Sequence, residues 1–137
     1  MVESFKQTDL DNFNKMSDVE TSEKAAKILE KHNVELHASA IVGRDWDKED
    51  FKNFAKWLHT IKYRYINFMS VCPLPGTDIY DGLKSELLFK EDEYEKFDFM
   101  HVMLRPTKLK TSQYYIEILK IYFRVTANLD NLFYIIT

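Results

Sequence analysis

Hydrophobic residues recur along the chain with two different periods. A helical period runs through residues 9–33, with a polar interruption at residues 16–22, and it returns in residues 47–61. Residues 34–42 instead alternate between apolar and polar positions, and residues 65–72 form a second apolar stretch of strand length. This order of strands and helices predicts an α/β fold in which parallel strands are joined by helical crossovers.

Polar residues at the ends of these segments suggest where the elements begin. Residues 2–5 are expected to end a further strand, because they run directly into a polar sequence. Ser17, which could form a capping box with Glu20, and Thr21 are alternative N-caps for the second part of the first helix. Asp47 is a suitable N-cap for the helix that follows the alternating segment.

The second half of the chain begins with a turn. Residues 74–77, Leu-Pro-Gly-Thr, match a type II turn, because proline sets φ at the second position and glycine supplies the positive φ of the third. Thr77 or Asp78 can then cap a short helix. Farther on, residues 97–104 are expected to be extended, and Ser112 to cap a long helix.

Composition narrows the class of protein. The chain has 137 residues, 45% of them hydrophobic, which suits one small domain. A net charge of −3 without a basic block gives no electrostatic reason to expect nucleic acid or a membrane surface. No apolar run is long enough to span a bilayer, and the single cysteine forms no internal disulfide. We therefore expect a cytoplasmic protein with no nucleic-acid or membrane partner. The histidine spacing predicts no metal site.

Four short segments, taken in order, resemble the later half of a radical S-adenosylmethionine (SAM) enzyme. They are VESF at 2–5, HASAIVG at 37–43, PLPGTDIY at 73–80 and FDFMHVMLRP at 97–106. Within this superfamily, the chain is most similar to a branch whose members often carry a B12-binding domain. That branch includes relatives of the anaerobic magnesium-protoporphyrin cyclase.

This resemblance implies a fold and a division of the chain. Residues 1–88 would form the C-terminal βα units, half of a partial (β/α)6 TIM-type barrel with parallel strands. Residues 89–137 would form a C-terminal extension that ends in a long helix.

One motif of the superfamily is absent. Its CxxxCxxC segment holds a 4Fe–4S cluster, whereas Cys72 is the single cysteine of this chain. We therefore expect a C-terminal fragment, either an excised piece or a truncated gene product, that is inactive without the N-terminal half of the barrel. The intact enzyme, an oxidoreductase or transferase, would use SAM and the iron–sulfur cluster. Because this branch often carries a B12-binding domain, the use of cobalamin as a further cofactor stays open. It would cleave SAM reductively to a 5′-deoxyadenosyl radical.

The resemblance also assigns cofactor contacts. Glu3 matches a position that contacts the SAM ribose, and Lys15 a basic position that neutralises the SAM carboxylate. Ser39 falls where some relatives carry an acid, while Ile41 and Gly43 match the strand that lies along the adenine. Each residue also has a plainer interpretation: a solvated carboxylate for Glu3, a surface lysine for Lys15, and ordinary strand packing for Ser39 and Ile41.

Three further residues are assigned to the substrate cavity, and no catalytic residue is predicted. Cys72 and Pro73 follow a strand end, and His101 matches a histidine that the family keeps in this region. The residues themselves favour a packed thiol over a nucleophile at Cys72 and a structural histidine at His101.

A second function remains open at this point, that of a stand-alone α/β interaction module without catalysis. Half a barrel leaves an open sheet edge and an uncovered apolar face. In isolation the chain is therefore expected to form a homodimer.

Overall fold

The computed structural model describes residues 4–12, 16, 18–61, 63 and 65–126. Its sheet has two parallel strands, β1 (His37–Val42) and β2 (Tyr65–Ser70), in register from His37 opposite Tyr65 to Val42 opposite Ser70. The helices of the described residues are α1 (Gln7–Asn12), α2 (Val19–Lys31), α3 (Lys48–Leu58), α4 (Asp78–Leu83) and α5 (Thr111–Thr126), with 3-10 turns η1 (Lys84–Glu86) and η2 (Tyr94–Lys96). The predicted α/β class and parallel pairing are confirmed, and closure into a partial barrel stays a prediction.

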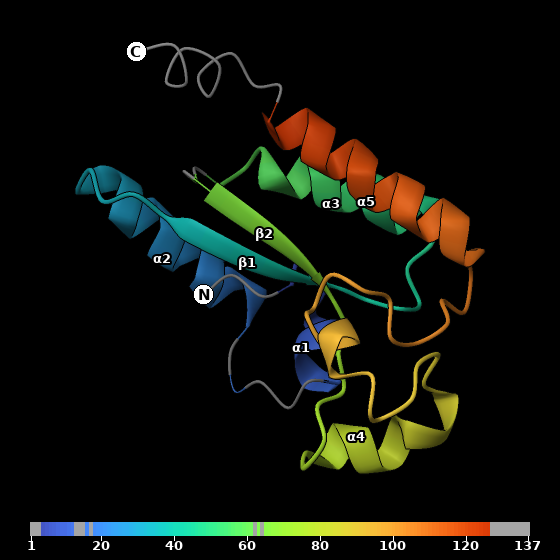
Figure 1. Ribbon diagram of the computed structural model, residues 1–137. Coiled ribbons are helices and arrows are strands. Elements are labelled where there is room, and N and C mark those ends of the chain that lie inside the picture. Colours follow the sequence, from blue (N-terminus) through green and yellow to red (C-terminus); the bar gives the residue numbers. More distant parts are fainter. Residues whose placement is uncertain (1–3, 13–15, 17, 62, 64, 127–137) are drawn as a thin grey trace.

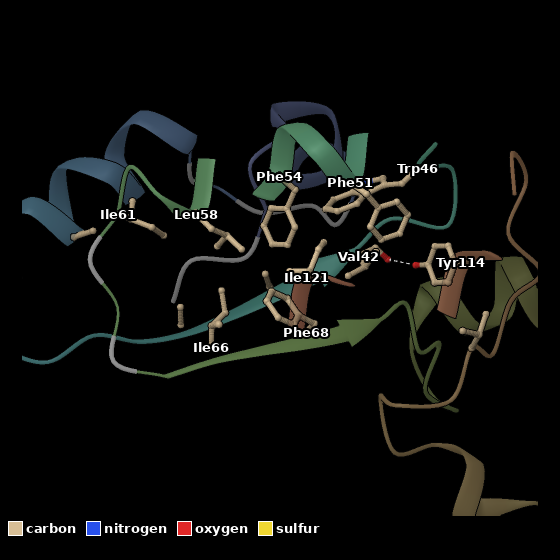
Figure 2. Packing of buried hydrophobic residues seen from close by; sticks show 14 residues of the cluster. Val42, Trp46, Phe51, Phe54, Leu58, Ile61, Ile66, Phe68, Tyr114 and Ile121 are labelled. Carbon is tan, nitrogen blue, oxygen red and sulfur yellow. Dashed lines mark hydrogen bonds between the residues drawn. The ribbon is translucent and has the colours of Figure 1, made fainter. Parts of the chain in front are cut away.

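Helices cover one face of this sheet. Figure 1 shows α3 and α5 side by side over the strands, with α1 and α4 beyond the ends to which both strands point. The core lies between the sheet and these helices (Figure 2), and its buried residues include Ala38, Ala40, Val42, Phe51, Phe54, Leu58, Ile66, Phe68, Tyr114 and Ile121. The predicted alternation is confirmed for residues 37–42, whereas residues 34–36 precede the strand and Val34, expected on the buried side, is exposed. Because α5 shares this core, the predicted division at residues 88 and 89 has packing across it, and that division stays a prediction.

The opposite face of the sheet is much less covered. Its residues are half-buried or exposed, and they are His37, Ser39, Ile41, Tyr65, Asn67 and Met69. In the predicted barrel this face would line the interior. Residues 4 and 5 are not in a strand, and the rest of the segment expected to end a strand lies outside the described residues.

The helix caps agree with the sequence at α3 and α4 and differ from it at α2 and α5. Asp47 caps α3 in a capping box with Asp50, and Thr77 caps α4 through the backbone N–H of Tyr80. The N-cap of α2 is Asp18, whose carboxylate accepts the Thr21 N–H at 2.6 Å. The prediction of Thr21 as an N-cap is therefore wrong, because Thr21 lies inside the helix. The other predicted N-cap, Ser17, lies outside the described residues.

The turn at residues 74–77 is confirmed, because Gly76 has φ +87° and the Thr77 N–H donates to the Leu74 carbonyl at 3.2 Å. The extended segment predicted at residues 97–104 is wrong. Asp98 folds the chain back by accepting the backbone N–H groups of the second and third residues after it, and only an isolated bridge pairs the end of this segment with residue 87. The α5 helix begins at Thr111, so Ser112 lies inside it and does not cap it.

Membrane spans and metal clusters are both absent from the described residues. No described helix is long and apolar enough to cross a membrane. Within the same part of the chain, no three histidine, cysteine, aspartate or glutamate side chains are grouped so that they could hold a metal ion.

Candidate functional site

A cavity of about 480 Å³ lies where the two parallel strands end. Its wall is built from the loop directly after β1, the residue after β2, the helices α1 and α4, and residues 104 and 107. This volume lies within the usual range for small-molecule sites. The carboxyl ends of parallel strands are also where α/β folds commonly bind ligands. We therefore treat this cavity as the candidate functional site.

Gly43 forms part of the wall and has a local structural reason to be glycine. A Cβ added there would lie 2.5 Å from Cδ1 of Trp46 and 2.9 Å from Oδ1 of Asp45, and it would overlap the indole Nε1. Tyr114 anchors the same loop, because its hydroxyl donates to the carbonyls of Val42 at 2.8 Å and Gly43 at 3.2 Å. The end of β1 is thus tied to α5, and the Trp46 indole folds closely over it.

Asp9 of α1 brings a buried carboxyl to the cavity wall. Its residue is 3% exposed, and its Oδ2 accepts hydrogen bonds from the Ser4 hydroxyl at 2.7 Å and the Trp46 indole N–H at 3.1 Å. Burial raises the pKa of the Asp9 carboxyl above its ordinary value, and these two hydrogen bonds only partly oppose that shift. Asp45 raises the pKa of Asp9 further, while Lys6 lowers it.

Arg44 connects the loop after β1 to the segments that close the other side of the cavity. Its guanidinium pairs with the carboxylate of Glu86 in η1 at 2.8 Å. Its backbone carbonyl accepts the N–H of Thr107 at 2.9 Å. Neighbouring α4 contributes the apolar side chains of Ile79 and Leu83 to the wall. The cavity therefore has both apolar and charged surfaces.

The predicted cofactor contacts are only partly gathered at this cavity. Gly43 lines it, whereas Ser39 and Ile41 lie farther back on β1, on the less covered face of the sheet. Glu3 and Lys15 lie outside the described residues. The role of all five in SAM binding stays a prediction.

The three residues assigned to a substrate cavity lie beside the end of β2 and do not line this cavity. Pro73 is fully buried, and burial raises the pKa of the half-buried Cys72 thiol, so that the neutral thiol is favoured. His101 is close to Asp98, with Nδ1 and Oδ2 2.9 Å apart. Hydrogen bonding, chiefly from the His101 backbone N–H, lowers the pKa of Asp98 to about 2. The Ser70 hydroxyl connects this group to β2 by donating to the His101 carbonyl at 2.5 Å.

Sequence reasoning missed several polar residues of the cavity wall: Asp9, Asn12, Arg44, Asp45 and Thr107. Arg44 and Asp45 follow a strand that ends at a glycine, so the rule that ligands bind at strand ends could have found them. Asp9 and Thr107 carry no such signal, because only the folded chain brings them next to that loop.

Comparisons with known proteins give one distant similarity. No family model matches the chain, and no solved structure matches it. The chain is similar to the bacteriochlorophyllide d C-8(2)-methyltransferase of Chlorobaculum tepidum, with 25% identity over 130 residues. The similarity covers 90% of this chain and 28% of that methyltransferase, so the chain spans little more than a quarter of its relative.

Proposed function

We propose that this chain is the C-terminal part of a radical SAM enzyme, in which it supplies part of the SAM pocket and one wall of the substrate cavity. The observation that carries the proposal is the cavity at the carboxyl ends of β1 and β2, with Gly43 on its wall. Two further findings support it: the four family-like segments in order, and the similarity of nearly the whole chain to part of a methyltransferase. That relative is named for a tetrapyrrole substrate, as is the cyclase-like branch, which supports a tetrapyrrole as the substrate class.

The described residues of the cavity fit SAM, but this chain alone does not fit a 4Fe–4S cluster. The cavity offers apolar surface from Ile79, Leu83 and Leu104 and polar groups from Asn12 and Thr107, a mixture that suits a nucleoside with a polar tail. A 4Fe–4S cluster needs three thiolates, and the chain has Cys72 alone, so residues outside this chain would hold the cluster. Cobalamin rests on the family resemblance alone.

In this proposal the chain binds and orients, and the chemistry belongs to the cofactors. SAM and the cluster, when bound, supply a 5′-deoxyadenosyl radical. Ile41 and the Gly43 backbone would lie along the adenine, while Glu3 and Lys15 would hold the ribose and the carboxylate of SAM. Of the three residues beside the end of β2, Cys72 and His101 would face the substrate, while Pro73 is buried.

The less covered face of the sheet supports a proposal about partners. Ile41 and Met69 are half-buried there and Tyr65 is 53% exposed, so this face exposes apolar surface. We propose that the N-terminal half of the barrel covers this face in the intact enzyme. A second copy would cover it when the chain is isolated, and light scattering over a range of concentrations tests this. A monomer at every concentration would contradict dimerisation.

The three glycines give a direct test of SAM binding. Gly43 and Gly82 line the cavity, whereas Gly76 does not, and nothing lies within 4 Å of a Cβ added at Gly76. In a ¹⁵N–¹H spectrum, S-adenosylhomocysteine, a stable analogue of SAM, should shift the amide signals of Gly43 and Gly82 and leave that of Gly76 in place. No shift, or an equal shift of all three signals, would contradict a SAM pocket and favour the interaction module.

In this proposal, radical SAM activity requires the N-terminal half of the barrel. The coding sequence upstream of this chain is expected to contain a CxxxCxxC segment. Reconstitution of that segment with this chain under reducing conditions should release 5′-deoxyadenosine from SAM. A reconstituted, cluster-loaded complex that leaves SAM intact would refute the enzymatic proposal.

A further inference from the structure

The charged groups on the cavity wall are unevenly balanced. Among the described residues of the wall, Asp9 and Asp45 are acidic and Arg44 is basic. Arg44 is already paired with Glu86 at 2.8 Å, and the nearby Lys6 is paired with Asp50 at 2.5 Å. A ligand that enters the cavity therefore meets the buried carboxyl of Asp9, whose basic neighbours are engaged elsewhere, while solvent screens the charge of the exposed Asp45. Such a wall favours a cation or a hydrogen-bond donor over an anion.

Within the described part of the chain, uncharged donors alone hold the Asp9 carboxyl in place. Its two hydrogen-bond donors, the Ser4 hydroxyl and the Trp46 indole N–H, are both uncharged, and both reach Oδ2. Among the described residues, no hydrogen bond to Oδ1 is found, although the residue is 3% exposed. A buried carboxylate with neutral partners only is costly, and that cost falls when a charged donor joins it. The raised pKa of Asp9 reflects the same burial.

We propose that Asp9 is the recognition carboxylate of this cavity and that it binds the amino or ammonium group of a nucleoside-sized ligand. The two neutral donors fix the Asp9 carboxyl group through Oδ2, and the ligand nitrogen donates to Oδ1. The inference takes from the proposed function only the premise that a small molecule enters this cavity. It adds a residue of α1 that the family resemblance did not assign and a chemical class for the group that this residue binds.

The two tryptophans allow a test on the unaltered chain. The indole N–H of Trp46 donates to Asp9 at 3.1 Å, and that of Trp57 donates to Glu23 of α2 at 2.7 Å. In a ¹⁵N–¹H spectrum, 5′-amino-5′-deoxyadenosine should shift the Trp46 indole signal and leave the Trp57 signal unchanged. The matched acid, adenosine-5′-carboxylate, should bind at least about tenfold more weakly, because a charge-assisted hydrogen bond is replaced by repulsion.

Two matched variants test the residue itself. Asp9→Asn keeps an oxygen acceptor for Ser4 and Trp46 but loses the negative charge. The affinity for the amine should therefore fall at least about tenfold. Asp45→Asn, on the same wall but exposed, should change the amine affinity about twofold at most, because solvent screens its charge. Circular dichroism checks that both variants are folded. If Asp9→Asn does not fold, the indole signals of the unaltered chain decide.

Several results would overturn this inference. The amine and the acid could bind with equal affinity, or a folded Asp9→Asn variant could bind the amine as well as the unaltered chain does. The Trp46 indole signal could also stay in place at saturating amine, or shift with Mg²⁺ but not with the amine. Binding of S-adenosylhomocysteine at Gly43 without any amine preference would refute this inference and leave the proposed function standing. If the amine preference depends on Asp9 but S-adenosylhomocysteine does not bind, this inference stands and the proposed function is refuted.

Discussion

Substitution of Gly43 by alanine tests the packing that shapes the cavity. The new Cβ would lie 2.5 Å from Cδ1 of Trp46 and 2.9 Å from Oδ1 of Asp45, both inside normal contact distance. Trp46 is 0% exposed, and its ring lies edge-on to Phe51 at 5.3 Å and Phe54 at 5.1 Å between centroids. The indole therefore cannot move aside without disturbing the core.

The cost of Gly43→Ala has two sources. Overpacking of a well-filled core typically costs about 1–3 kcal/mol. Displacement of the indole also breaks its hydrogen bond to Asp9, and a buried acceptor that loses a donor costs about 1–3 kcal/mol. Together these terms should lower the free energy of unfolding by about 2–6 kcal/mol, a large part of the roughly 5–15 kcal/mol typical of a domain.

Urea denaturation followed by circular dichroism measures this change. Gly82→Ala is the matched control, because Gly82 lies in α4 with no neighbour within 4 Å of an added Cβ. Alanine is the better helix former, so that variant should be neutral or more stable by up to about 1 kcal/mol. Trp46→Phe removes the indole N–H, which is both an atom that the Cβ of residue 43 would overlap and the donor to Asp9, so Gly43→Ala should cost less in that background. A loss below about 0.5 kcal/mol, or an equal loss in both backgrounds, would refute the reasoning.

Three further predictions concern the same region. Tyr114→Phe removes the hydroxyl that donates to the Val42 carbonyl at 2.8 Å, and should lower the free energy of unfolding by about 1–2 kcal/mol in urea denaturation. Burial raises the pKa of Asp9 in the folded chain above its ordinary value of 3.8, so the folded state holds the proton more tightly than the unfolded state. The free energy of unfolding should therefore fall as the pH rises from 3.8 through the raised pKa of the folded state. The difference between wild type and Asp9→Asn isolates this term. The Arg44–Glu86 pair, with side chains 28% and 50% exposed, should contribute at most about 1 kcal/mol in a double-mutant cycle, and less at high salt.

Each of these three has an outcome that would contradict it. An unchanged midpoint for Tyr114→Phe would mean that the hydroxyl is not held between β1 and α5. A wild-type stability that rises with pH relative to Asp9→Asn would mean that the folded state favours the ionised carboxylate. A coupling energy for Arg44 and Glu86 that is independent of salt would contradict a solvent-screened pair.

Features that depend on near neighbours could be predicted from the order of the residues alone. The alternation of residues 37–42 identified the buried side of β1, Asp47 identified the start of α3, and the Pro75–Gly76 pair identified the turn before α4. These follow from side-chain period, cap chemistry and the allowed φ of proline and glycine, all of which act within a few residues. The fold class follows from their order, since strands that alternate with helices pair in parallel.

Features that depend on contacts between distant residues became visible only in the folded chain. The segment at residues 97–104 has an apolar sequence, but the Asp98 turn and the contact with the end of β2 prevent a strand there. The cavity wall likewise joins Asp9, Arg44 and Thr107, which are far apart in sequence and meet only when the helices pack on the sheet. Gly43 belongs to both levels: its place at a strand end was readable from the sequence. The requirement for glycine there comes from the Trp46 indole, whose position the core sets.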